Sequence, residues 1–411
     1  MRNGLGRNRD VMAVSTLIHL WDAPHKPLFQ AAFAAALVTI GWWPLGVWLG
    51  LPEPAFAPVV LWHVHELLFG FAAAAVGGYL MTALPSWTVR PPIKGKFLKS
   101  LLMLWIAARI ATAAANHLPV GLLVVINSGY FLMLAGMICH QVTAAQVYRK
   151  IGFGLAVLAL GVAETLFLIA AMTDNFEISK TVTQLVLLGF ALLIVVIAGR
   201  AIPAFTRNWL LQTKCKTTQV SNSPGAQNLA QTLLITALAC QLAGGQTAMA
   251  IVLLSAAVAV IYSMRHWVIV SSFSNPLLAA LHLSYLWLPI GFVLVALDVF
   301  FQDLFRWEAS IHAITIGAMS GLIMAISGRA AAHQPDGILR AHPSFAFAVL
   351  LITLTTLARL AAPIFSNHWT ELVMVAAALW CLGWALFIAY FLPVMLAPSP
   401  RPVLSGSKHQ P

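Results

Sequence analysis

Long apolar runs recur along the chain at the spacing of successive membrane helices. The hydrocarbon core of a bilayer is roughly 30 Å thick, so a helix needs about 20 apolar residues to cross it. Twelve runs approach that length, near residues 28–50, 59–84, 97–115, 119–141, 151–173, 181–203, 229–244, 246–265, 276–300, 309–330, 342–362 and 370–396. The pattern therefore predicts an all-α polytopic membrane protein with twelve transmembrane helices.

The polar segments between these runs are short, which predicts one membrane domain with small extramembrane parts. The longest polar stretch, residues 207–228, contains a Pro-Gly turn and is typical of a loop. We expect residues 1–27 to form a cytoplasmic N-terminal segment, 28–396 a single twelve-helix membrane domain, and 397–411 a cytoplasmic tail.

Composition supports a membrane protein and excludes several other classes. The chain is 60% hydrophobic and 9% charged, with a mean hydropathy of +0.87, whereas a soluble domain carries about 25% charged residues. The net charge of +11 is not gathered in a block of five or six basic residues, so nucleic acid is not an expected partner. The four cysteines form no CxxC or CxxCH pattern, which argues against a zinc ribbon and covalent c-type haem.

The placement of the basic residues predicts the orientation. With both termini in the cytoplasm, only Lys180 and Arg306 of the 23 Lys and Arg residues lie in external loops, and Arg109 and Arg359 lie within spans. The other 19 lie on the cytoplasmic side, as the positive-inside rule requires.

Short motifs recur with a four-helix period. A polar residue stands five positions before a glycine at His65 and Gly70, at Gln184 and Gly189, and at His312 and Gly317. Arg109 matches Arg359 in the helices that follow, and Gln241 is a weaker echo. These offsets predict three pseudo-repeats of four helices, near residues 28–150, 151–275 and 276–396.

The repeat-matched histidines and arginines share one predicted depth, in the outer part of the membrane. Ionisable groups within spans are costly and usually functional. Two neutral imidazoles from different helices can hold a b-type haem, and arginines can pair with its propionates. We therefore predict His65 and His312 as axial ligands, with Arg109 and Arg359 near the propionates. The alternative is that these side chains are hydrogen-bonded core residues.

Other polar groups in the spans suggest further metal chemistry. His63 points roughly 200° away from His65 on a straight helix, so it meets a second metal or lies at an interface. Glu66 adjoins His65, and adjacent helix residues do not face each other, which favours a hydrogen bond to a neighbouring helix. A second layer near the cytoplasmic side has the imidazole, thiolate and thioether groups that copper prefers. It comprises Met81, Cys139, His140, Met264, His266, His282, His333 and His342, of which His282 lies deepest and His333 has the alternative of a solvated loop position.

Several motifs together resemble the NnrS family. They are Trp-His-Val-His-Glu-Leu-Leu-Phe-Gly-Phe-Ala at 62–72, Leu-Met-Thr-Ala-Leu-Pro-Ser-Trp-Thr at 80–88, and the segments 198–208, 281–289 and 311–319. The resemblance implies a twelve-helix protein of the bacterial inner membrane, associated with nitric oxide metabolism and nitrosative stress and containing haem and copper. It implies His63, His65, His282, His312 and His333 as matched histidine positions.

The sequence also departs from that family pattern. Relatives often carry a Phe-His pair in the fifth helix, where this chain has Phe167-Leu168 with Glu164 one turn earlier. The N-terminal Arg-Pro-Phe-Phe motif is reduced to Lys-Pro-Leu-Phe at 26–29. A metal site that needs the fifth-helix histidine is therefore not expected here.

The expected function is haem-based electron transfer or interaction with nitric oxide. The layout is similar to that of haem-copper oxidases and nitric oxide reductases, but their active-site histidine pattern is missing, so binding or electron transfer is favoured over catalytic reduction. Expected partners are the lipid bilayer, nitric oxide or a related small molecule, and an electron donor or respiratory complex. The repeats and the proline-broken helices also suit a transporter or metal exporter, and an assembly partner of respiratory complexes is a third alternative.

Overall fold

The chain is helical throughout the part that the structure describes. The computed structural model describes residues 19–213, 220–301, 307–332 and 339–398, and no β-strand occurs among them. Ten of the described helices are long and apolar enough to cross a membrane. Each of the ten overlaps one of the twelve predicted spans, so the prediction of a polytopic α-helical membrane protein is confirmed at this level.

The two remaining predicted spans correspond to helices that are more polar. Helix α5 (Lys96–Ala113) carries Lys96, Lys99 and Arg109 within its 18 residues. Helix α9 (Pro224–Leu242) carries four Asn and Gln side chains within 19 residues. Both have the length of a span, but neither is apolar enough to count among the ten.

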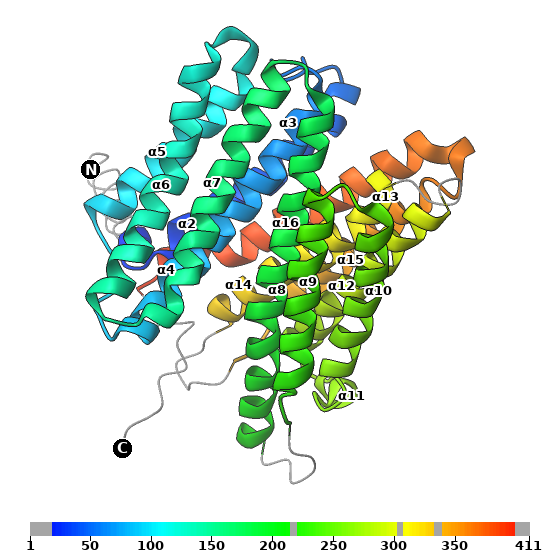
Figure 1. Cartoon of the computed structure of the whole chain (residues 1–411). Helices are drawn as coiled ribbons and strands as arrows, with labels where there is room; N and C mark the ends of the chain where they lie inside the picture. Colours follow the sequence, from blue (N-terminus) through cyan, green and yellow to red (C-terminus); the bar gives the residue numbers. More distant parts are fainter. Residues whose placement is uncertain (1–18, 214–219, 302–306, 333–338, 399–411) are drawn as a thin grey trace, which may run out of the picture. The chain divides into compact units, whose positions relative to one another are not determined.

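Two compact units divide the chain. Unit 1 consists of Met1–Val182 with Ile388–Pro411, and unit 2 of Thr183–Phe387. The boundary at residue 182 lies inside the long helix α8 (Phe176–Gln212), so the units do not coincide with the three predicted repeats. The described helices of unit 1 are α2 (His25–Ile40), α3 (Val59–His65), α4 (Ala73–Thr88), α5, α6 (Val120–Ala144), α7 (Ile151–Met172), the start of α8 and the end of α16 (Trp369–Leu396) (Figure 1).

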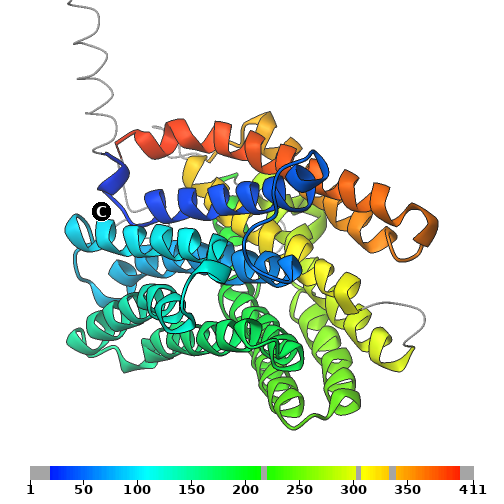
Figure 2. The ribbon, with the colours of Figure 1, turned by 90° about the horizontal axis from the view of Figure 1, so that it is seen from above.

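Small residues set the packing in unit 1. Helices α5, α6 and α7 lie side by side, as both views of the ribbon show (Figures 1 and 2). An added Cβ at Gly161 of α7 would lie 2.7 Å from Cβ of Phe131 in α6, so the glycine permits the close approach of these helices. This contact is one turn from Glu164 and helps to place that side chain.

A buried lysine joins the two chain segments that make up unit 1. Lys26 Nζ, in the first turn of α2, donates to the carbonyl oxygen of His19 at 2.9 Å and to that of Ala397 at 2.6 Å. The rings of Phe33 and Phe391 meet edge to face with centroids 5.0 Å apart. The residues that follow 387 are therefore packed against the first helix of the chain.

Unit 2 is built from the remaining helices. It contains most of α8, then α9, α10 (Gln246–Ser263), α11 (Ile269–Ser272), α12 (Pro276–Phe300), α13 (Trp307–His312), α14 (Gly321–Ala331), α15 (Pro343–Ala361) and most of α16. Helix α10 packs against both α9 and α12. Gln241 Nε2 donates to Gln184 Oε1 at 2.6 Å, which pairs α9 with α8 at two of the positions matched in the predicted repeats.

Candidate functional site

His65 and His312 occupy the same kind of position in the backbone. His65 is the last residue of α3, and a π-helical segment, η3 (Glu66–Ala72), follows it directly. His312 is the last residue of α13 and precedes the π-helical segment η6 (Ala313–Ser320). Gln184, the third matched residue, lies within the continuous α-helix α8. Because π segments are rare and concentrate at functional sites, the two histidines are set apart from the glutamine.

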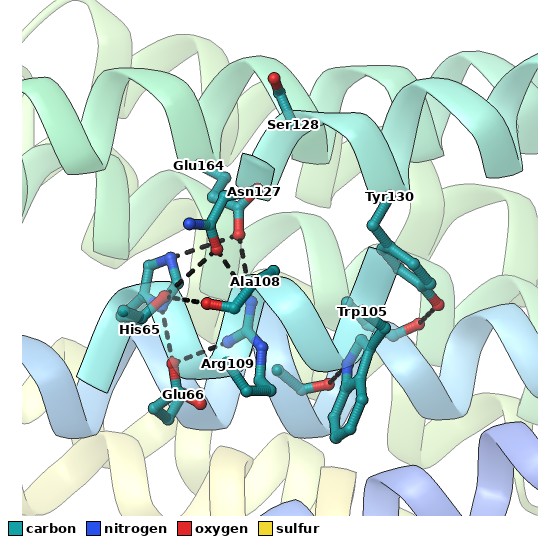
Figure 3. Close-up of polar contacts among 12 residues, drawn as sticks. His65, Glu66, Trp105, Ala108, Arg109, Asn127, Ser128, Tyr130 and Glu164 are labelled. Atoms are coloured by element: carbon teal, nitrogen blue, oxygen red, sulfur yellow. Dashed lines mark hydrogen bonds and ion pairs between the residues drawn. The ribbon is translucent and has the colours of Figure 1, made fainter. Parts of the chain in front are cut away.

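His65 lies between two carboxylates in the interior of unit 1. Its Nδ1 is 3.1 Å from Oε1 of Glu66, and its Nε2 is 3.2 Å from Oε1 of Glu164 on α7 (Figure 3). The His65 and Glu164 side chains are 0% exposed, and that of Glu66 is 5% exposed. The imidazole thus joins α3, η3 and α7 through polar contacts out of reach of water.

Arg109 of α5 completes the cluster. Its Nη1 donates to Glu66 Oε1 at 2.7 Å and its Nη2 to Asn127 Oδ1 at 3.1 Å, while Nη2 lies 3.6 Å from Glu164 Oε1 (Figure 3). An added Cβ at Gly70 would lie 2.8 Å from Nη1 of Arg109, so the motif glycine leaves room for the guanidinium. We call His65, Glu66, Arg109, Asn127 and Glu164 the buried cluster.

The buried cluster contains two carboxyl groups, one guanidinium and one imidazole. Two carboxylates and one guanidinium carry a net charge of −1, which one further proton, on the imidazole or on a carboxylate, would cancel. Charge balance matters because an uncompensated charge in a nonpolar interior is costly. Nε2 of His65 and both oxygens of Glu164 form no hydrogen bond of good geometry, so these atoms still have bonding capacity.

The surroundings of His65 fit a metal ligand in chemistry, under one steric condition. A histidine that binds a metal through Nε2 is commonly held at Nδ1 by a carboxylate, as Glu66 holds His65. The Glu164 carboxylate fills the space beside Nε2, and the Phe167 ring of the same helix lies 5.9 Å from the imidazole. Ligation of His65 would therefore require Glu164 to move away. Among the residues that the structure describes, no group of three or more His, Cys, Asp or Glu side chains is placed to hold a metal ion.

The matched residues of unit 2 have different neighbours. His312 is half-buried at the end of α13, which packs against α15, the helix of Arg359. The Arg359 guanidinium lies 5.3 Å from the ring centre of Trp369, and its Nη1 has no hydrogen bond. The motif glycine of this repeat, Gly317, lies against the indole ring of Trp287.

The other predicted metal ligands have contacts of their own or lie outside the described residues. The half-buried His63 ring meets the Trp43 ring at 5.3 Å in an edge-to-face arrangement. His282 is buried in unit 2, with its Nε2 3.1 Å from the Thr206 hydroxyl and its ring 5.9 Å from that of Trp267. His333 lies outside the residues that the structure describes. The ligand roles of all these histidines stay predictions.

The structure links His65 and Arg109 through Glu66, which contacts both, and it adds residues to which the sequence interpretation gave little weight. Glu66 contacts the residue next to it, contrary to the expectation for neighbours on a helix, at the point where α3 passes into η3. Glu164 and Asn127 supply the remaining contacts. The available signal was the presence of Glu66 and Glu164 inside predicted spans, where charged groups are costly.

Comparison with known families gives one match. A family model described as NnrS protein matches residues 19–399, nearly the whole chain. No curated protein matches the chain.

Proposed function

Because the chain belongs to the NnrS family, we propose that it is a membrane protein of nitric oxide metabolism that protects bacteria against nitrosative stress and carries a b-type haem. Haem-based electron transfer or interaction with nitric oxide is the proposed activity, and copper is the proposed second metal. The support is the family match over residues 19–399 together with ten helices able to cross a membrane. We place the protein in the inner membrane with both termini cytoplasmic.

The observation that carries the haem proposal is the equivalence of His65 and His312. Both stand at a junction between α-helix and π-helix, although they are far apart in the sequence. His65 is also held at Nδ1 by a buried carboxylate, which would fix the ring orientation that a ligand needs. We propose each of these two histidines as a haem ligand, and a bound haem would supply an iron centre for electron exchange or for nitric oxide.

The remaining residues of the site have roles that follow from their contacts. Glu66 would orient the His65 ring, and Arg109 would hold the Glu66 carboxyl group in place by a 2.7 Å hydrogen bond. Arg359, whose Nη1 has no hydrogen bond, is better able to receive a propionate than Arg109, whose terminal nitrogens already contact protein groups. Glu164 would have to move from Nε2 when His65 is ligated.

Twelve spans in three repeats form part of the proposal. In the first predicted repeat, Glu66 in the helix of the His65 motif contacts Arg109 in the next helix. In the second repeat, Gln184 contacts Gln241 in the next helix in the same way. In this arrangement α5 and α9 cross the membrane with Arg109 and Gln241 directed toward other helices.

Purified protein from haem-replete cells tests the proposal. A reduced-minus-oxidised pyridine haemochrome spectrum is expected to show stoichiometric b-type haem, and His65→Ala and His312→Ala are each expected to abolish it. His117→Ala, at an exposed histidine of unit 1, serves as the control and should keep the wild-type content. Iron and copper are measured in the same samples.

Each result of that experiment has a defined meaning. A preparation without haem in any variant would refute the cofactor proposal. Haem retained at wild-type content in His65→Ala would remove His65 from the ligand set. Haem lost in both histidine variants, with nitric oxide then shifting the wild-type spectrum, would support the whole proposal.

A transporter is the second candidate, because the buried cluster favours it independently of haem. Ionisable side chains enclosed within membrane helices often line ion or substrate pathways. Haem-free protein that moves a solute across liposomes, and loses that flux in Glu164→Gln, would establish transport. Function in cells that survives replacement of both His65 and His312 would instead favour a role in assembling respiratory complexes.

A further inference from the structure

The π-helical segment η3 receives hydrogen bonds from side chains of two neighbouring helices. Trp105 Nε1, on α5, donates to the carbonyl oxygen of Gly70 at 3.0 Å, and the Tyr130 hydroxyl, on α6, donates to that of Ala73 at 3.2 Å (Figure 3). Gly70 lies within η3 and Ala73 directly follows it. Trp105 and Tyr130 are 6% and 1% exposed, so both bonds lie in the interior of unit 1.

These donors meet a requirement that a π segment creates inside a membrane. A π-helix pairs each N–H with the carbonyl five residues back instead of four, so backbone carbonyls change partners where it meets an α-helix. A carbonyl without a donor is costly in hydrocarbon, because no water can replace the missing bond. A side chain that donates to a carbonyl at such a place therefore stabilises the π segment relative to a continuous α-helix.

The π segment that follows His312 meets the same requirement in another way. Ser320 Oγ, the last residue of η6, donates to the carbonyl oxygen of Thr315, five residues back, at 2.8 Å. Side-chain donation to a carbonyl thus accompanies both π segments that follow a matched histidine, and η3 takes its donors from α5 and α6.

The form of η3 determines the direction in which His65 points. Successive residues of an α-helix are about 100° apart around the axis, so one extra residue in a turn rotates the residues before it by about that angle relative to those after it. The residues after η3 are held by close packing of α4. An added Cβ at Gly77 would lie 2.5 Å from the Tyr130 oxygen, and one at Gly78 would lie 3.0 Å from Cδ1 of Phe29 on α2. With α4 fixed, a continuous α-helix would turn His65 out of the buried cluster.

Helix α5 contacts η3 at two places one turn apart. Arg109 Nη1 donates to the side chain of Glu66, the first residue of η3, and Trp105 donates to the backbone at Gly70, four residues further on. The arginine therefore holds a side chain that contacts His65, whereas the tryptophan holds the backbone of the segment that follows His65.

We propose that Trp105 and Tyr130 are positioning residues for His65. Their bonds to the carbonyls of Gly70 and Ala73 keep η3 in its π-helical form, and η3 in turn keeps the imidazole in the buried cluster. This role rests on the proposed function, in which His65 is a haem ligand whose orientation must be fixed. Neither side chain has to touch the haem.

Hydrogen exchange and chemical modification of the intact, detergent-solubilised protein test these roles without requiring haem. Tyr130→Phe and Trp105→Phe each remove one donated hydrogen bond, the first with little change of shape. Amide exchange in the peptide covering residues 62–73 is expected to rise about fivefold in each variant and about 25-fold in the double variant. Modification of His65 by diethyl pyrocarbonate, located by tandem mass spectrometry, should rise by similar factors as the imidazole leaves the buried cluster.

Tyr148→Phe is the matched control, because Tyr148 is a 61% exposed tyrosine of unit 1, and it should leave both rates at the wild-type value. The exposed His117 supplies the reference rate of modification. An equal rise of exchange in η3 and α7 would indicate general loss of packing and overturn the proposal. Faster exchange in η3 with His65 still protected would also overturn it, because the bonds would then hold only the backbone. The expected changes in protein that binds no haem would refute the cofactor and leave Trp105 and Tyr130 as the residues that place His65.

Discussion

Replacing Arg109 by glutamine is expected to lower the free energy of unfolding by about 3–5 kcal/mol, since it removes one partner of a buried ionic group. The variant leaves the carboxylates of Glu66 and Glu164, which are 5% and 0% exposed, without their cation. Reversible unfolding of the detergent-solubilised protein by SDS measures the change. Arg109→Lys should fall between wild type and glutamine, because lysine keeps the charge but cannot reach both Glu66 and Asn127 in forked geometry.

A double variant separates lost charge compensation from lost packing. If the cost arises from an unpaired carboxylate, Arg109→Gln combined with Glu164→Gln should be more stable than Arg109→Gln alone. Packing loss would instead make the two effects add. Wild-type stability in Arg109→Gln would show that the buried cluster carries no strong electrostatic coupling.

Gly317→Ala is expected to destabilise the protein by about 3 kcal/mol, the upper part of the range for overpacking a core. The added Cβ would lie 2.8 Å from both Cβ and Cδ2 of Trp287, and an indole ring cannot move aside without shifting α12. The same unfolding assay measures the effect. The loss of stability should arise in unit 2, because Gly317 and Trp287 both belong to it.

The three motif glycines provide a graded comparison for that prediction. An added Cβ at Gly189 has nothing within 4 Å, so Gly189→Ala should be neutral or stabilise α8 by up to about 1 kcal/mol. Gly70→Ala should lie between the two, because its closest contact is the end of the Arg109 side chain. Equal effects at all three sites would contradict the steric explanation.

The helices were predictable because hydrophobic runs determine them directly. Each apolar run long enough to cross a bilayer corresponds to a described helix, including α5 and α9, which are more polar than the other ten. Orientation and span position also put His65 and Arg109 at one predicted depth, and in the structure both contact Glu66. The depth of a residue in the membrane follows from its position along the predicted span.

The rest of the buried cluster depends on rotation about the helix axis, which residue counting does not supply. Glu164 reaches His65 because α7 is turned and held close to α6 where Gly161 meets Phe131. Glu66 contacts the same ring at the residue where the α-helix passes into a π-helix. Apolar periodicity carries no signal for a single π segment, so neither contact followed from the pattern of residues.

The contact of Lys26 with Ala397 has a consequence for the order in which the protein matures. A ribosome synthesises residues 388–398 only after all of unit 2, yet these residues belong to unit 1. Until they emerge, the Lys26 ammonium lacks the acceptor at Ala397 and the Phe33 ring lacks the ring of Phe391. The contacts of unit 1 can therefore be completed only after unit 2 has been synthesised.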